Sequence, residues 1–140
     1  MSKAAPPLAQ SGALDPEAER DRHAGLVARI CARLDQTLSH HGLPVVGIDP
    51  HRAECSLRVD SYSQESVLVL RWTPDAAGRG GNLTINGDGS FFAEYDVLLD
   101  VPAGHPSLPP QFVEATTAWG RGARMGSELR LIPWPEESGG

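Results

Sequence analysis

The chain has 140 residues, of which 40% are hydrophobic and 21% charged, and its formal net charge is −6. This length suggests one domain with a core large enough to fold without a disulfide or a metal, and the composition excludes wholesale disorder. The negative charge argues against nucleic acid or an anionic membrane as partner, because both require dense positive charge.

The N-terminal sequence indicates the compartment. Residues 1–14 lack the hydrophobic segment of a signal peptide, and no apolar stretch approaches the roughly 20 residues needed to span a bilayer. Cys31 and Cys55 each fall on an apolar stripe and are interpreted as small buried hydrophobes, although a disulfide between them is an alternative. We therefore expect a cytoplasmic protein. Lys3 is the only lysine among 12 basic residues, which suggests a GC-rich bacterial genome.

The first predicted element is a helix that follows a flexible leader at residues 1–14. Asp15 can cap the helix, and Pro16 fits its first position without losing a hydrogen bond. Apolar residues then recur at three- and four-residue steps along one helical stripe: Leu26, Val27, Ile30, Cys31, Leu34, Leu38 and His41. Gly42 ends the helix. We expect firm packing over residues 26–41 and a solvated helix before them.

Period-two alternation then predicts strands. Residues 54–60 alternate apolar and polar side chains, which is typical of a strand with one face on a core. Residues 66–72 are apolar on both faces and are expected to form a central strand.

Residues 82–99 are predicted to form a hairpin with its turn at residues 87–89. A three-residue turn opposes Ile85 to Phe91 and Leu83 to Ala93, so each cross-strand pair is apolar.

The last third is predicted to contain a proline-rich loop, a second helix and an edge strand. Phe112, Ala115 or Thr116, and Trp119 share a helical face, so the helix is placed over residues 112–119. Residues 128–134 are interpreted as the edge strand, and residues 135–140 as a disordered tail.

The predicted fold class is α+β, with one domain over residues 15–134 and the element order α-β-β-β-β-α-β. The predicted sheet is mainly antiparallel and five-stranded, with two helices packed on one face. In architecture and charge alone, such an acidic chain is broadly similar to secretion-chaperone folds.

The motifs that usually carry chemistry are missing. Residues 84–95 fit a calcium loop poorly, the glycine clusters do not match phosphate-binding loops, and no nucleophile elbow occurs. The five histidines lack the spacing of a metal site. We therefore expect no catalytic residue, no cofactor and no metal, and we lean against an enzyme.

Both faces of the predicted sheet carry apolar patches, but two helices can cover only one face, so the other is left without cover. Phe92 shares this face with Glu94 and Asp96, and Arg58 or Arg71 on a neighbouring strand could pair with the two acids. The leading hypothesis is a chaperone- or adaptor-like module that binds another protein, or forms a homodimer, through this face or an edge strand.

The alternative is a small-ligand pocket between helix and sheet, with or without enzymatic activity. Its walls would be Trp72, Tyr95 and Trp119, and Arg121 or Arg124 would hold an anionic group.

Overall fold

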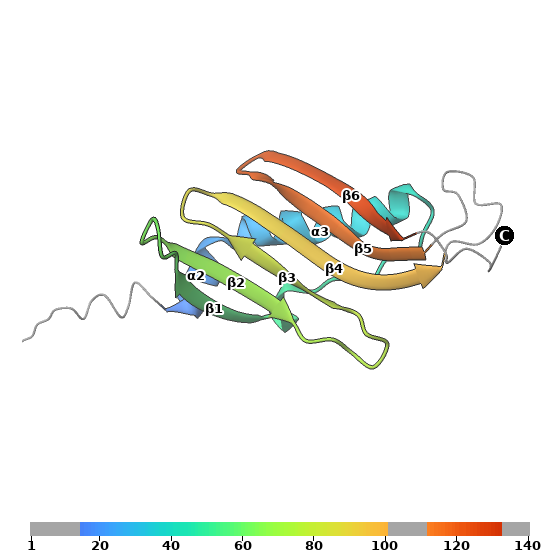
Figure 1. The fold of residues 1–140 in the computed structure, drawn as a ribbon, viewed down its shortest axis with the longest axis horizontal. Helices are drawn as coiled ribbons and strands as arrows, with labels where there is room; N and C mark the ends of the chain where they lie inside the picture. The colour runs from blue at the N-terminus through green and yellow to red at the C-terminus, as the bar shows by residue number, and fades with distance from the viewer. Residues whose placement is uncertain (1–14, 101–111, 133–140) are drawn as a thin grey trace, which may run out of the picture.

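The computed structural model describes residues 15–100 and 112–132. They form two α-helices, one short 3-10 helix and six strands (Figure 1). The elements are α2 (Pro16–Arg22), α3 (Ala24–His40), η1 (Pro50–Arg52), β1 (Glu54–Val59), β2 (Ser66–Trp72), β3 (Gly80–Ile85), β4 (Ser90–Asp100), β5 (Phe112–Arg121) and β6 (Arg124–Ile132). The predicted leader at 1–14 and tail at 135–140 lie outside the described residues. No described helix has both the length and the apolar character needed to cross a membrane.

The strands form one antiparallel sheet in the order β1-β2-β3-β4-β5-β6, so each strand pairs with its neighbours in sequence. The predicted hairpin is confirmed: Ile85 faces Phe91, Leu83 faces Ala93, and the N–H of Asn86 donates to the carbonyl of Ser90 at 2.8 Å. The α+β class is confirmed as well, with six strands instead of the predicted five.

The predicted helix over residues 112–119 is wrong, because this segment is β5. Four consecutive residues at its centre are buried: Ala115, Thr116, Thr117 and Ala118. Burial of both faces removes the period-two pattern, and a register shift between Val113 and Ala115 disturbs it further. The apolar residues that remained happened to fit helical spacing.

The two helices both come from the N-terminal segment. Asp15 caps α2 as predicted, with its side chain accepting the Glu17 N–H at 3.1 Å. The single expected helix is interrupted at His23, which separates α2 from α3. The last strand begins at Arg124, earlier than predicted, because Gly122 with φ +59° lies in a tight turn between β5 and β6.

The core lies between α3 and the sheet. Ile30, Leu34 and Leu38 of the predicted helical stripe are fully buried there. The Thr116 hydroxyl donates to the Leu34 carbonyl at 3.0 Å and so ties β5 to the helix. The Trp72 indole N–H donates to the Asp49 carbonyl at 2.8 Å, which satisfies a polar group at the core boundary.

A carboxylate on α3 fixes the segment that leads from the helix to the sheet. Asp35 accepts the backbone N–H groups of Val46 at 2.8 Å, Gly47 at 3.1 Å and Ile48 at 2.8 Å. Charge-assisted bonds of this kind are stronger than neutral ones. This contact was not predicted from the sequence.

Candidate functional site

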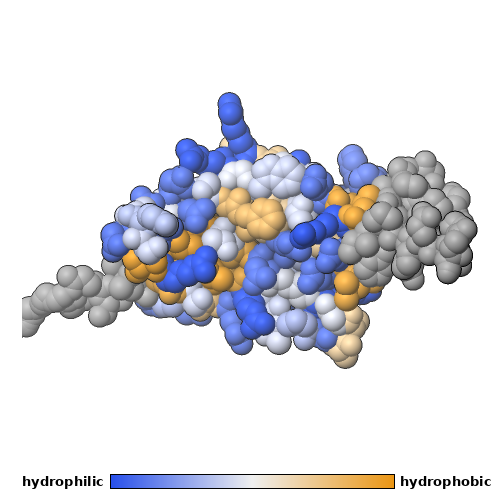
Figure 2. Space-filling model, in the orientation of Figure 1, coloured by the Kyte–Doolittle hydropathy of each residue, from blue (hydrophilic) through white to orange (hydrophobic). Residues whose placement is uncertain are grey.

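The two faces of the sheet differ in their cover. Figure 1 shows α2 and α3 on the far side of the sheet, and no described element lies over the near side. Figure 2 shows that near side, with apolar surface at its centre and left among hydrophilic side chains. We call it the open face. Its residues on β4, β5 and β6 are Phe92, Glu94, Asp96, Ala115, Thr117, Trp119, Gly126, Glu128 and Arg130.

An aromatic pair occupies one end of these strands. Phe92 on β4 lies opposite Trp119 on β5, and their exposed fractions are 50% and 40%. Trp119 in turn lies opposite Gly126 on β6, where a Cβ atom would come within 2.9 Å of the indole ring. The absence of a side chain at Gly126 therefore lets the indole lie across β6.

The next two rows of side chains across β4, β5 and β6 contain most of the charged residues of the open face on these strands. Glu94, Thr117 and Glu128 form one row across β4, β5 and β6. In the following row, Arg130 reaches back to Glu94 with an N–O distance of 2.9 Å and forward to Glu114 with 3.5 Å. One arginine is thus shared by two carboxylates.

The aromatic and charged rows enclose a shallow hollow of about 490 Å³. Its lining residues are Phe92, Thr117, Trp119, Glu128 and Arg130. The floor is Thr117, which is 6% exposed and donates its hydroxyl to the Glu128 carbonyl at 3.3 Å. A hollow with an apolar wall and charged sides suits an amphipathic group.

The carboxylates of the open face are crowded. Partial burial raises the pKa of Asp96, and the negative charges of Glu94 and Glu114 raise it further, while Arg130 acts in the opposite direction. A cation brought to this face would relieve that repulsion.

Four of the six predicted site residues lie on this face: Phe92, Glu94, Asp96 and Trp119. The other two, Arg121 and Arg124, flank the turn between β5 and β6. Arg121 pairs there with Asp88 at 2.7 Å, and hydrogen bonds from Ser90 lower the pKa of Asp88. The two arginines therefore flank the aromatic end of the open face and do not line its hollow.

The alternative pocket with walls at Trp72, Tyr95 and Trp119 does not form. Trp72 and Tyr95 are buried on the helix side, with ring centroids 5.7 Å apart in an edge-to-face arrangement. Trp119 lies on the opposite face of the same sheet. Strand alternation separates these residues, because Tyr95 and Phe92 occupy positions of opposite parity on β4.

The sequence analysis did not connect Glu114, Thr117, Glu128 and Arg130 with this site. Arg58 or Arg71 was considered as a possible partner of the acids of β4, whereas the described ion pair to Glu94 comes from Arg130. Had residues 112–121 been assigned to a strand, the alternation would have placed Thr117 and Trp119 on one face of the sheet.

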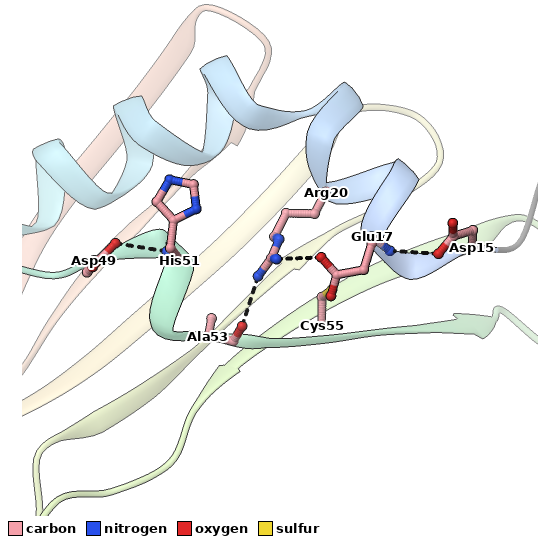
Figure 3. A network of polar contacts seen from close by, with 7 residues as sticks. All are labelled: Asp15, Glu17, Arg20, Asp49, His51, Ala53 and Cys55. Carbon is pink, nitrogen blue, oxygen red and sulfur yellow. Dashed lines mark hydrogen bonds and ion pairs between the residues drawn. The ribbon is translucent and has the colours of Figure 1, made fainter.

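Both cysteines are free thiols, and neither is an activated nucleophile. Burial, together with Asp35 and Asp49, raises the pKa of Cys31 to about 12. Cys55 is only half-buried; its thiol donates to Glu17 at 3.1 Å, and burial and this bond raise its pKa. Figure 3 shows Glu17, Arg20 and Cys55 pointing toward one another between α2 and β1, where Arg20 also donates to the Ala53 carbonyl at 3.0 Å. These contacts attach α2 to the sheet.

Two other features bear on ligand chemistry. Among the described residues, no group of three His, Cys, Asp or Glu side chains lies close enough to hold a metal. A hollow of about 300 Å³ lies between the α2–α3 junction and the ends of β1, β2 and β3. Its polar wall includes Arg22 and Glu19, which pair with each other at 2.8 Å, and also His23 and Glu65.

Comparison with known proteins found no matching family model, no matching curated protein and no matching solved structure.

Proposed function

We propose that the protein is a non-enzymatic binding module, and that its open face holds a basic, amphipathic segment of another protein. The observation that carries the proposal is the pairing of Phe92 with Trp119 at the surface, beside an excess of carboxylates. Large aromatic side chains on a sheet face without cover mark interaction sites more often than isolated exposed residues do.

The charges of the open face favour a cationic partner. On β4, β5 and β6, four acids, Glu94, Asp96, Glu114 and Glu128, surround one base, Arg130. Arg58 and Arg71 share this face on β1 and β2. An arginine or lysine of the partner would compensate this excess, and its side chain could stack on Trp119 through a cation–π contact. An apolar side chain beside it would fill the hollow next to Phe92.

The same charges disfavour a homodimer in which the β4–β6 parts of two open faces meet, because the four acids of each copy would outnumber its one arginine there. The expected occupant is therefore a different protein. A dimer in which Trp119 becomes buried would overturn this choice, and light scattering over a concentration series would detect it.

The direct test is titration of the full chain with a fluorescein-labelled peptide that contains arginine and leucine in equal numbers. A peptide with glutamate in place of arginine is the control. We expect binding of the arginine peptide that weakens as salt is raised, since screening acts on exposed charges.

Two variants assign the binding to this face. Trp119→Ala should lower the affinity about tenfold, as expected for an interfacial aromatic anchor, and Glu94→Lys/Asp96→Lys should lower both the affinity and its salt dependence. Asp21→Lys, a charge reversal at an exposed position of α2, should leave binding close to that of the unmodified chain. Equal affinity of the double variant and the unmodified chain would refute the proposal.

A further inference from the structure

A second surface lies at the edge of the sheet, on the opposite side of β6 from β5. No described strand pairs with this edge, and β6 contains no proline over its nine residues. A free edge presents backbone N–H and C=O groups at alternate residues, and such a row can pair with another strand. Natural sheets often block it, and this one does not block it with proline or a bulge in β6.

A groove runs between this edge and α3. Two hollows of about 310 and 280 Å³ lie along it and share Arg33 and Gln36. Figure 1 shows α3 and β6 extending in the same general direction, so the groove follows the strand. We call it the edge groove; its lining residues are Arg29, Ala32, Arg33, Gln36, Thr37, His40, His41, Ala123, Met125 and Ser127.

The titratable side chains described in this lining are all basic: Arg29, Arg33, His40 and His41. The one acid of α3 is Asp35, and its carboxylate is occupied by the backbone of residues 46–48. The positive charge of the edge groove is therefore not compensated from within the helix, in a chain whose net charge is −6.

Arg33 is held beside the strand. Its Nε donates to the Ser127 hydroxyl at 2.8 Å, and the Thr37 hydroxyl lies 2.9 Å from the same oxygen. The guanidinium has five N–H donors, and within the described part of the chain only the Nε donor has a partner. The remaining donors are thus positioned next to the edge of β6, with which no described strand pairs.

We propose that an extended segment of a partner protein pairs with β6 as a seventh strand and directs acidic side chains into the edge groove, onto Arg29 and Arg33. Backbone hydrogen bonds to a sheet edge supply affinity that does not depend on sequence, and the side chains on one face of the added strand supply specificity. Here the groove next to that face is basic, so it selects carboxylates. Pairing of two copies through β6 would bring their arginines together and is disfavoured.

This surface is chemically the reverse of the open face, and the proposal does not depend on the proposed function. If both sites operate, the protein links a basic segment and an acidic strand, as an adaptor would.

The test uses the full chain and a fluorescein-labelled peptide of the sequence Thr-Glu-Val-Glu-Val-Glu-Thr, in which the glutamates share one face of a strand. A peptide with lysine in place of glutamate is the control. Fluorescence anisotropy should give an affinity for the glutamate peptide at least about tenfold higher than for the lysine peptide. No binding of the glutamate peptide, or equal binding of both, would overturn the proposal.

Backbone methylation distinguishes strand pairing from simple charge attraction. N-methyl groups placed at every second residue remove either the N–H groups that face β6 or those that face solvent. The peptide that is methylated at the N–H groups facing β6 should not bind, whereas the peptide that is methylated at the N–H groups facing solvent should bind as before. Equal affinity of the two methylated peptides would mean that the peptide does not add a strand to the sheet.

Charge reversals locate the site. Arg29→Glu/Arg33→Glu should lower the affinity about tenfold, whereas Arg58→Glu/Arg71→Glu, on strands at the opposite edge, should leave it unchanged. Because Arg33 also contacts Ser127, the single variant Arg29→Glu is measured beside them, and it should lower the affinity severalfold. Trp119→Ala should not change binding of this peptide, so failure here and failure at the open face are separable.

Discussion

Phe91 and Phe92 are neighbours in β4, and they have opposite surroundings. Phe91 is 4% exposed in the core beneath the helices, whereas Phe92 is 50% exposed on the open face. One strand thus places one phenylalanine in the packed core and the next phenylalanine on an exposed surface. Residue type alone does not separate core from binding surface; strand parity and the position of the helices do.

The sharpest test of this contrast is the cost of truncation on each face. Leu83→Ala removes a fully buried side chain from the helix side and should lower the free energy of unfolding by about 2–5 kcal/mol. Phe92→Ala removes a larger but half-exposed side chain and should cost about 1 kcal/mol or less. Urea denaturation measures both. Comparable losses would mean that the open face is part of the core.

The next largest effect is expected on the helix side of the molecule, at Asp35. Asp35→Ala leaves the N–H groups of Val46, Gly47 and Ile48 without their charged acceptor, which should cost about 2–3 kcal/mol. Hydrogen exchange at these three amides should accelerate in the variant. Unchanged exchange would show that other contacts hold the segment.

Thr116 and Thr117 are neighbours in β5 whose side chains point to opposite faces of the sheet, so the same substitution can be compared on the two faces. Thr116→Val removes the buried hydroxyl that donates to Leu34 and should cost about 1 kcal/mol. Thr117→Val removes a longer bond of 3.3 Å on the open face and should cost less. Thermal denaturation of both variants ranks them, and the reverse order would contradict the assignment of Thr116 to the helix contact.

The smallest expected effect is a gain in stability, on substitution of Asp96. The pKa of Asp96 is raised in the folded state, so the folded protein binds this proton more tightly than the unfolded chain does. The stability that Asp96 contributes is full below the ordinary carboxyl pKa and is lost as pH rises through the raised pKa. Asp96→Asn should therefore stabilise the protein at pH 7, with a gain that shrinks as the pH is lowered into the acidic range. A gain that does not change with pH would point to packing instead of charge.

Local sequence patterns predicted the first two-thirds of the fold well. The stripe from Leu26 to Leu38 became the buried face of α3, and the Gly87–Gly89 turn gave the correct register of β3 against β4. The helix and the hairpin each have one exposed face and one buried face, and this difference is visible in the sequence as a regular spacing of apolar residues.

The last third of the fold could not be predicted in this way, because its pattern depends on which faces other parts of the chain cover. β5 is buried on both faces at its centre, so Ala115 and Thr117 carry no sign of which face is which. The candidate site was predicted for β4, where alternation is clear, whereas on β5 only Trp119 was predicted, and on a helix, and the residues of the site on β6 were missed. Arg130, which contacts both Glu94 and Glu114, was not predicted as a partner of these carboxylates.

The hydrogen bond between Thr116 and the Leu34 carbonyl spans 82 residues, and it has a consequence for synthesis of the chain. Each strand pairs with the strand made just before it, so β1 to β4 can assemble in the order in which they are translated. Helix α3 is made earlier, but much of its apolar stripe packs against β5 and β6, which emerge last. A chain that has left the ribosome only as far as β4 would therefore hold four of the six strands, while much of the apolar stripe of α3 is still exposed to water, and such a partly folded state is prone to aggregation.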